Sequence, residues 1–175
     1  MKIQRIVTAE GKSGVATKIE TFDTATGEFL SNIWGFDTVP SLPLTPEQVL
    51  GEYKQKGIFG PLGGVRIDLF TIAPEKKEAP SELERAAAVD MGTGGGMIPG
   101  KDGDGMHRTD SIDFVIVIDG ETNVGYPGDD GQVHELTVKT GDVIVHNGTF
   151  HSWHNRSTKD CTVIFVVLAA ERTAT

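Results

Sequence analysis

Two histidines, His107 and His151, lie far apart in the chain, each within a segment that has the composition of a β-strand. Asp113 follows His107 and shares its parity, so in a regular strand the two side chains would face the same side. If His151 also faces inward, two imidazoles and one carboxylate converge on one point. Such a set suits Fe(II), Mn(II), Ni(II) or Zn(II), with positions left open for a ligand. The alternative is a pair of hydrogen-bonded pocket histidines that hold no metal.

Further residues of the same parity are predicted to line a substrate pocket. Thr109 lies between His107 and Asp113, and its neutral hydroxyl is a poor metal ligand. Trp153 and Asn155 share the parity of His151 and are predicted to face inward with it. Trp34, from the N-terminal half, is predicted to cover the mouth of the pocket, although packing in a core or a dimer explains it equally well.

Two residues are candidates for catalysis beside the proposed metal. Arg108 follows His107, and its guanidinium could bind a substrate carboxylate, although a salt bridge at the surface is the simpler interpretation. His146 lies at a strand end before Asn147-Gly148 and could act as an acid or base at the pocket rim. His154 and His134 are predicted to face outward.

Regular turn signals divide the C-terminal part of the chain into short strands without helices between them. The turns are rich in glycine, aspartate and asparagine, as at Asp119-Gly120 and Asn147-Gly148. This spacing indicates an antiparallel sandwich or barrel. The predicted strands are 65–72, 111–119, 121–126, 133–138, 142–146, 149–155 and 161–169.

The N-terminal half has a more mixed character. Strands are predicted at 3–9, 15–22 and 29–34. A helix is predicted to begin at Pro46, with Thr45 as N-cap and Gln48 completing a capping box, and to end at Gly57. Residues 1–64 are therefore assigned to an extension that packs on the barrel or on a partner subunit, and residues 65–175 to the barrel, within one domain overall.

The segment 73–106 has little strand character. Ser81-Glu82-Leu83-Glu84 could form one helical turn, and the glycine-rich stretch 92–105 is either a surface loop or a lid over a pocket. The glycine cluster is not a phosphate-binding loop, since no Lys-Ser or Lys-Thr pair follows it. The stretch Asp102-Gly103-Asp104-Gly105 lacks the closing glutamate of a calcium-binding loop.

From Gly105 onward the chain resembles the cupin superfamily, whose members carry two histidine-containing motifs. His107 occupies the first histidine position of the first motif, Thr109 replaces the second histidine and Asp113 replaces the glutamate. The second motif is nearly intact. It runs from Gly141-Asp142-Val143 through Asn147-Gly148 to His151-Ser152-Trp153-His154-Asn155. The resemblance implies an all-β fold, the double-stranded β-helix or jelly-roll barrel, and a homodimer.

The resemblance also implies a function. We expect a divalent metal, Fe, Mn, Ni or Zn, to be bound by His107, Asp113 and His151. The chain would then be an enzyme of lyase, dehydratase, decarboxylase or isomerase type that acts on a small organic molecule. The alternatives are a dioxygenase that uses Fe(II) and O₂, or a cupin that binds a small ligand without turning it over.

Composition excludes several other classes of protein. The 175 residues fit one domain, and the net charge of −9 with no basic run argues against nucleic-acid partners. No apolar run is long enough to span a bilayer, and the N-terminus lacks the core of a signal peptide. The single cysteine, Cys161, lies in an apolar run and is predicted to be a small buried hydrophobe. A cytoplasmic protein is therefore expected.

Overall fold

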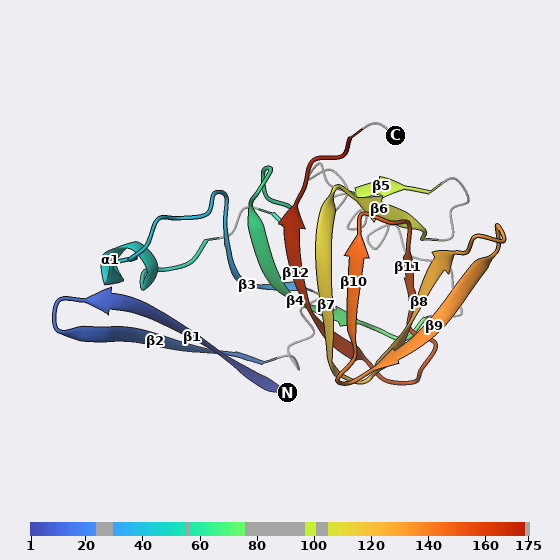
Figure 1. The fold of residues 1–175 in the computed structure, drawn as a ribbon. Coiled ribbons are helices and arrows are strands. Elements are labelled where there is room, and N and C mark those ends of the chain that lie inside the picture. The colour runs from blue at the N-terminus through green and yellow to red at the C-terminus, as the bar shows by residue number, and fades with distance from the viewer. Residues whose placement is uncertain (24–29, 55–56, 76–96, 101–104, 174–175) are drawn as a thin grey trace.

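The computed structural model describes residues 1–23, 30–54, 57–75, 97–100 and 105–173, and these residues form an all-β protein (Figure 1). Among them the one helix is α1 (Pro46–Val49), and no helix has the length and apolar character needed to cross a membrane. The strands are, in chain order, β1 (Lys2–Gly11), β2 (Gly14–Asp23), β3 (Leu30–Phe36), β4 (Val65–Ile72), β5 (Met97–Pro99), β6 (His107–Thr109), β7 (Ser111–Asp119), β8 (Glu121–Pro127), β9 (Val133–Lys139), β10 (Val143–Asn147), β11 (Ser152–His154) and β12 (Cys161–Ala169).

One wall of the barrel is a five-stranded antiparallel sheet in the order β10-β7-β12-β4-β3. Successive side chains along each strand point to opposite faces of the sheet, as β7 illustrates. Val115 and Val117 are fully buried on the inner face, whereas Phe114 is 40% exposed on the outer face. The sequence alternation therefore sets which side chains can reach the interior.

The opposite wall consists of the three-stranded sheet β11-β8-β9 and the pair β5-β6. An antiparallel bridge between His107 and His151 joins β6 to the start of β11, so the strands continue in the order β5-β6-β11-β8-β9. The chain crosses from this wall to the other between β6 and β7. Two antiparallel sheets that face each other in this order form a jelly roll, so the predicted double-stranded β-helix is confirmed.

The barrel core lies between the two walls and consists of small branched side chains. Cys161 belongs to it and is completely buried, as predicted. Burial raises the pKa of its thiol to about 11, because the thiolate would lose its hydration. The buried apolar cluster comprises Val115, Val117, Val124, Val138, Cys161 and Val163.

The N-terminal hairpin of β1 and β2 extends away from the barrel (Figure 1). Arg5 connects the two parts, because its side chain forms an ion pair with Glu20 and donates a hydrogen bond of 2.6 Å to the Ile33 carbonyl of β3. The guanidinium also lies over the rings of Trp34 and Tyr53, at 5.7 and 5.6 Å from their centroids. β3, which the sequence assigned to the extension, pairs with β4 as an edge strand of the barrel.

The structure differs from the sequence-based expectation at two elements. The helix predicted from Pro46 to Gly57 ends at Val49, although the Gln48 side chain accepts the Thr45 N–H at 2.8 Å as predicted. An isolated helix of that length is marginal, and Gly51 weakens its continuation. β5 was not predicted, because its three residues contain a proline and acquire strand geometry only by pairing with β6. The predicted turn at 81–84 and most of the 92–105 stretch lie outside the described residues.

We predict that Gly120→Ala destabilises the barrel more than Gly131→Ala. Both glycines have a positive φ, +79° and +75°, so alanine at either position should cost about 1 kcal/mol. A Cβ on Gly120 would also lie 2.5 Å from the Asp160 carbonyl oxygen, whereas Gly131 has open space. Overpacking against backbone should add about 1–3 kcal/mol. Urea unfolding measures both variants, and equal losses would contradict the prediction.

Candidate functional site

The backbone holds His107 and His151 directly opposite each other. His107 N–H donates to the His151 carbonyl and His151 N–H donates to the His107 carbonyl, both at 2.8 Å. The two imidazole rings lie side by side, with centroids 4.5 Å apart. The predicted convergence of these two histidines is therefore observed.

Each of the two imidazoles is oriented by a carbonyl two residues earlier in the chain. Nδ1 of His107 lies 2.9 Å from the Gly105 carbonyl oxygen, and Nδ1 of His151 lies 2.9 Å from that of Thr149. A carbonyl can only accept, so each Nδ1 carries the hydrogen. In the neutral rings Nε2 is then left with a free lone pair. Histidines that bind metals are commonly oriented by such a carbonyl.

Arg172 stabilises the turns on which the two histidines depend. Its guanidinium donates to the Asp110 carboxylate at 2.6 Å, to the Thr109 carbonyl at 3.1 Å and to the Gly148 carbonyl at 2.8 Å. One side chain near the C-terminus thus joins the turn after β6 to the turn before His151.

His146 stacks on His151, with ring centroids 3.8 Å apart and planes inclined by 10°. Trp153 packs edge-on against both rings. Nε2 of His146 is buried and has no hydrogen-bond partner. The sequence placed His146 at a pocket rim, whereas the structure buries it to 6% exposure as part of a three-histidine cluster.

Asp113 is the carboxylate that the sequence predicted for the site, and it is 3% exposed. It lies opposite His146 in the β7-β10 pairing. Thr109 donates a hydrogen bond of 3.0 Å to its Oδ2, and the Ser111 hydroxyl lies near the carboxylate, although Oδ1 has no partner at hydrogen-bond distance. Burial raises the pKa of Asp113, because the ionised form is poorly solvated there.

The two stacked histidines are held neutral. Burial lowers the pKa of His151 to about 3 and that of His146 to about 4, since an imidazolium would lose its hydration. The neighbouring imidazoles lower both pKa values further. Neutral imidazoles keep the lone pairs that a metal or a hydrogen-bond donor requires.

A cavity of about 290 Å³, here called the inner cavity, lies between the two walls. His107, His151, Asp113, Thr109 and Trp153 all line it, as the sequence predicted. Most of the remaining wall is apolar. It is formed by Ile58, Phe59, Phe70, Ile72, Phe165 and Val167.

Asp68 also lines the inner cavity, and sequence reasoning missed it. It is 1% exposed and accepts a hydrogen bond of 2.7 Å from the Asn32 amide of β3. The available signal was the pattern in β4, where Arg66 and Asp68 alternate with Val65, Ile67 and Leu69. Asp68 shares its face with Phe70 and Ile72, which also line the inner cavity, whereas Leu69 is buried on the other face. Because both faces of β4 carry apolar residues that are at least partly buried, the alternation did not show which face points inward.

The two proposed catalytic residues lie elsewhere. Arg108 and His146 do not line the inner cavity but a second one of about 530 Å³, here called the rim cavity. Arg108 points away from His107 because adjacent strand residues face opposite sides, and its guanidinium lies over the Phe150 ring. His146 reaches the rim cavity because it lies on β10, behind His151.

Two predicted pocket residues do not line the inner cavity. Trp34 stacks on Tyr53 at 4.7 Å and lies under Arg5, so it packs the base of the hairpin. Asn155 is 1% exposed and holds a loop. Its amide donates to the carbonyls of Ile72 and Lys159 and accepts from Ser157.

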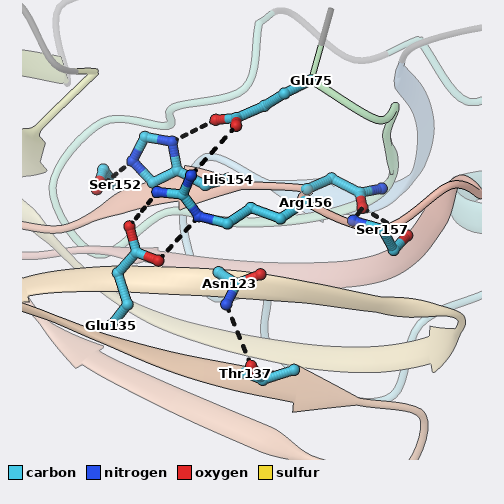
Figure 2. Close-up of polar contacts among 9 residues, drawn as sticks. Glu75, Asn123, Glu135, Thr137, Ser152, His154, Arg156 and Ser157 are labelled. Carbon is cyan, nitrogen blue, oxygen red and sulfur yellow. Dashed lines mark hydrogen bonds and ion pairs between the residues drawn. The ribbon is translucent and has the colours of Figure 1, made fainter.

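The outer side of β11 is fixed by a network of charged side chains (Figure 2). His154, predicted to face outward, lies 2.6 Å from Glu75 through Nδ1 and 3.0 Å from the Ser152 hydroxyl through Nε2. Arg156 forms ion pairs with Glu75 and Glu135. This network ties the segment after β4 to β11 and β9, and thereby stabilises the strand that carries Trp153.

The candidate donors do not form a preassembled metal centre. Within the described part of the chain, no three His, Cys, Asp or Glu side chains are grouped closely enough to hold an ion. His107, His151 and Asp113 all line the inner cavity, but their side chains are not arranged to bind one ion together. The observed geometry therefore does not by itself contain the metal site that the sequence predicted.

We predict that Asn155→Ala lowers the free energy of unfolding by about 3 kcal/mol, because buried carbonyls and the Ser157 amide lose their partners. Asn123→Ala is the matched control. Asn123 donates one exposed hydrogen bond to Thr137 (Figure 2), and its removal should cost less than about 0.5 kcal/mol. Chemical denaturation measures both, and similar losses would show that the Asn155 contacts contribute little.

We predict that the metal-free protein loses stability as the pH falls below 6.5. The pKa values of His146 and His151 are lowered to about 4 and 3, so the unfolded chain binds protons in this range that the folded chain does not. The free energy of unfolding should fall by roughly 1.4 kcal/mol per pH unit for each imidazole. The raised pKa of Asp113 acts in the opposite direction.

Removal of His151 provides the check on this prediction. In His151→Gln the slope of stability against pH between 6.5 and 4.5 should decrease, because one proton fewer is taken up on unfolding. Urea titrations at several pH values measure the slope. An unchanged slope would mean that the buried imidazole does not determine the acid sensitivity.

Comparison with known proteins finds relatives that share part of the chain. No family model matches it. It is similar to the phomopsin biosynthesis cluster protein C' of Diaporthe leptostromiformis, with 42% identity over 67 residues, which cover 38% of this chain and 33% of that protein. The oryzines biosynthesis cluster protein J of Aspergillus oryzae is 36% identical over 66 residues, which cover 37% and 35%. The match therefore spans about a third of the length of these relatives.

The similar solved structures share less sequence with this chain. The DMSP lyase DddQ of Ruegeria pomeroyi is 12% identical, with a TM-score of 0.40, and the match covers 66% of this chain and 44% of that one. A Klebsiella pneumoniae protein described as having a double-stranded β-helix domain is 18% identical, with a TM-score of 0.38 and coverage of 62% and 70%. By its own strand pairing, this chain is a double-stranded β-helix protein, the architecture of the cupins that its His107 and His151 segments resemble.

Proposed function

We propose that the chain is a metal-dependent enzyme that acts on a small organic molecule in the inner cavity. One observation carries this proposal. His107 and His151 each direct Nδ1 to a backbone carbonyl, which leaves Nε2 free, and they share a cavity with a buried carboxylate whose Oδ1 has no partner. Buried polar atoms without partners are rare in folded proteins, and a bound ion or ligand is one way to satisfy them.

The residues fit a divalent transition metal by their chemistry. Two imidazole nitrogens and one carboxylate oxygen are the donors that Fe(II), Mn(II), Ni(II) and Zn(II) accept with positions left open. The carbonyls of Gly105 and Thr149 would orient the imidazoles, and the Thr109 hydroxyl would orient Asp113. The donors are not grouped closely enough as they stand, so binding would require their side chains to move together.

The cavity would determine which molecule reacts there. A bound metal would supply a Lewis acid for a carbonyl or enolate oxygen. The apolar walls exclude water, and Trp153 and Phe165, packed edge to face at 5.7 Å, offer an aromatic surface to an apolar substrate. This environment supports chemistry of the lyase, dehydratase, decarboxylase or isomerase type. The similar proteins named for the phomopsin and oryzines biosynthesis clusters support a role in biosynthesis of small molecules.

A second candidate function is binding without catalysis. It is favoured by the absence of a preassembled donor group among the described residues and by the predominantly apolar wall. The remaining alternative is a dioxygenase, and a measurement of oxygen uptake distinguishes it from a lyase. Consumption of O₂ by the iron-loaded protein in the presence of substrate would favour the dioxygenase.

We predict that the metal-free protein binds one equivalent of Ni(II) or Zn(II), and that His151→Gln and Asp113→Asn each weaken binding by at least about 100-fold. Each removes a direct ligand, and the loss of an outer-shell partner alone typically costs about 10–100-fold. Isothermal titration calorimetry with each metal alone measures the affinity. His154→Gln is the matched control, since that imidazole lies on the outer side of β11 and should leave the affinity unchanged.

Two results decide between the functions. Stoichiometric binding that is lost in His151→Gln but kept in His154→Gln supports the metal enzyme. Absence of binding to the wild-type protein, with folding verified by circular dichroism, would overturn the enzyme proposal in favour of a metal-free binding barrel.

A further inference from the structure

The rim cavity is a separate binding space on the other side of the histidine stack. It lies where the edge strands β9 and β10 of the two sheets face each other, and β8 contributes to its wall. None of its lining residues lines the inner cavity. The stacked rings separate the two cavities, since His151 lines the inner one and His146 lines the rim one. Its volume of about 530 Å³ suits a small molecule.

Most of the wall of the rim cavity is apolar. Val124 and Val138 form its floor and belong to the barrel core, and Ile144 packs beside them. Leu136 and Tyr126 line its opening and are 56% and 36% exposed. A hydrocarbon chain or an aromatic group would cover these surfaces and remove them from water.

Two nitrogen-bearing side chains supply the polar part of the wall. Arg108 lies with its guanidinium carbon 5.0 Å from the Phe150 ring centroid, and its Nε is buried without a hydrogen-bond partner. Among the described residues, no acidic side chain forms an ion pair with it. His146 is 6% exposed, and its Nε2 also has no partner.

These groups call for an anionic partner that can accept hydrogen bonds. A buried donor without an acceptor is unfavourable, and a guanidinium binds a carboxylate through two parallel hydrogen bonds. A neutral imidazole can donate through Nε2 to the same group. The chain as a whole carries a net charge of −9, so an anion would gain nothing from the general field and would depend on Arg108.

We propose that the rim cavity binds an amphipathic monocarboxylate, with its apolar tail against Val124, Val138 and Ile144 and its carboxylate at Arg108 and His146. The site is independent of the function proposed for the inner cavity, because the two share no lining residue. A ligand of this class combines the two properties of the wall, an apolar surface and two unpartnered nitrogen groups.

The first test compares octanoate with 1-octanol, which has the same chain without the charge. Calorimetry on the full chain, with EDTA present so that no metal competes, should show octanoate binding at least about tenfold more tightly than octanol. Arg108→Gln should weaken octanoate binding by about tenfold or more and leave octanol binding unchanged. Arg156→Gln, an exposed arginine on the outer side, is the control. Equal affinity for the two probes, or unchanged octanoate binding in Arg108→Gln, would overturn the proposal.

The second test locates the binding site. Leu136 and Val133 both lie on β9 and are both 56% exposed, but only Leu136 lines the rim cavity. Octanoate binding should be weakened in Leu136→Glu and retained in Val133→Glu, because only the first places a carboxylate beside the ligand. Light scattering accompanies the titration. If Leu136→Glu instead converts a dimer into a monomer and octanoate does not bind the wild-type protein, the cavity is an interface between copies and the proposal fails.

Discussion

The two backbone hydrogen bonds between His107 and His151 are the constraint on which the site depends. They are the link between β6 and β11, so the second wall of the barrel is continuous only where the two imidazoles stand opposite each other. A change that opened this bridge would separate the rings and also detach the β5-β6 pair from the wall. Fold and site are therefore maintained by the same contact, and Arg172 reinforces it from the adjoining turns.

The interior of this barrel contains several buried polar groups, and their placement has physical consequences. Asp68, Asp113, His146 and His151 are each at most 6% exposed, whereas a core normally excludes charged groups. Neutral histidines and a carboxyl group with a raised pKa reduce the cost of burial. The unpartnered atoms of Asp113 and His146 retain part of that cost. Ligands in the two cavities would relieve it, since Asp113 lines the inner cavity and His146 lines the rim cavity.

The sequence predicted the barrel and much of the site because both are encoded by short-range patterns. Alternation and turn residues define the strands from Val65 onward, and parity alone places His107, Thr109 and Asp113 on one face. Parity also places Arg108 on the face opposite His107, and Arg108 accordingly lines the rim cavity and not the inner one. Parity within one strand does not tell which neighbouring side chains will pack against it. His146 therefore lines the rim cavity, and Trp34 is held at the hairpin by Arg5 and Tyr53. Asp68 was missed because both faces of β4 carry buried side chains, so alternation did not show that Asp68 faces the cavity.

The histidine stack also determines how substitutions in this protein can be interpreted. His151 lines the inner cavity and supports the ring of His146, which lines the other, so its replacement disturbs both spaces. Asp113 lines only the inner cavity, and Leu136 lines only the rim cavity. Effects seen in His151 variants alone therefore cannot be assigned to one cavity. An effect shared by His151 and Asp113 variants and absent from Leu136 variants belongs to the inner cavity, because neither His151 nor Asp113 lines the rim cavity. By the same reasoning, an effect shared by His151 and Leu136 variants belongs to the rim cavity.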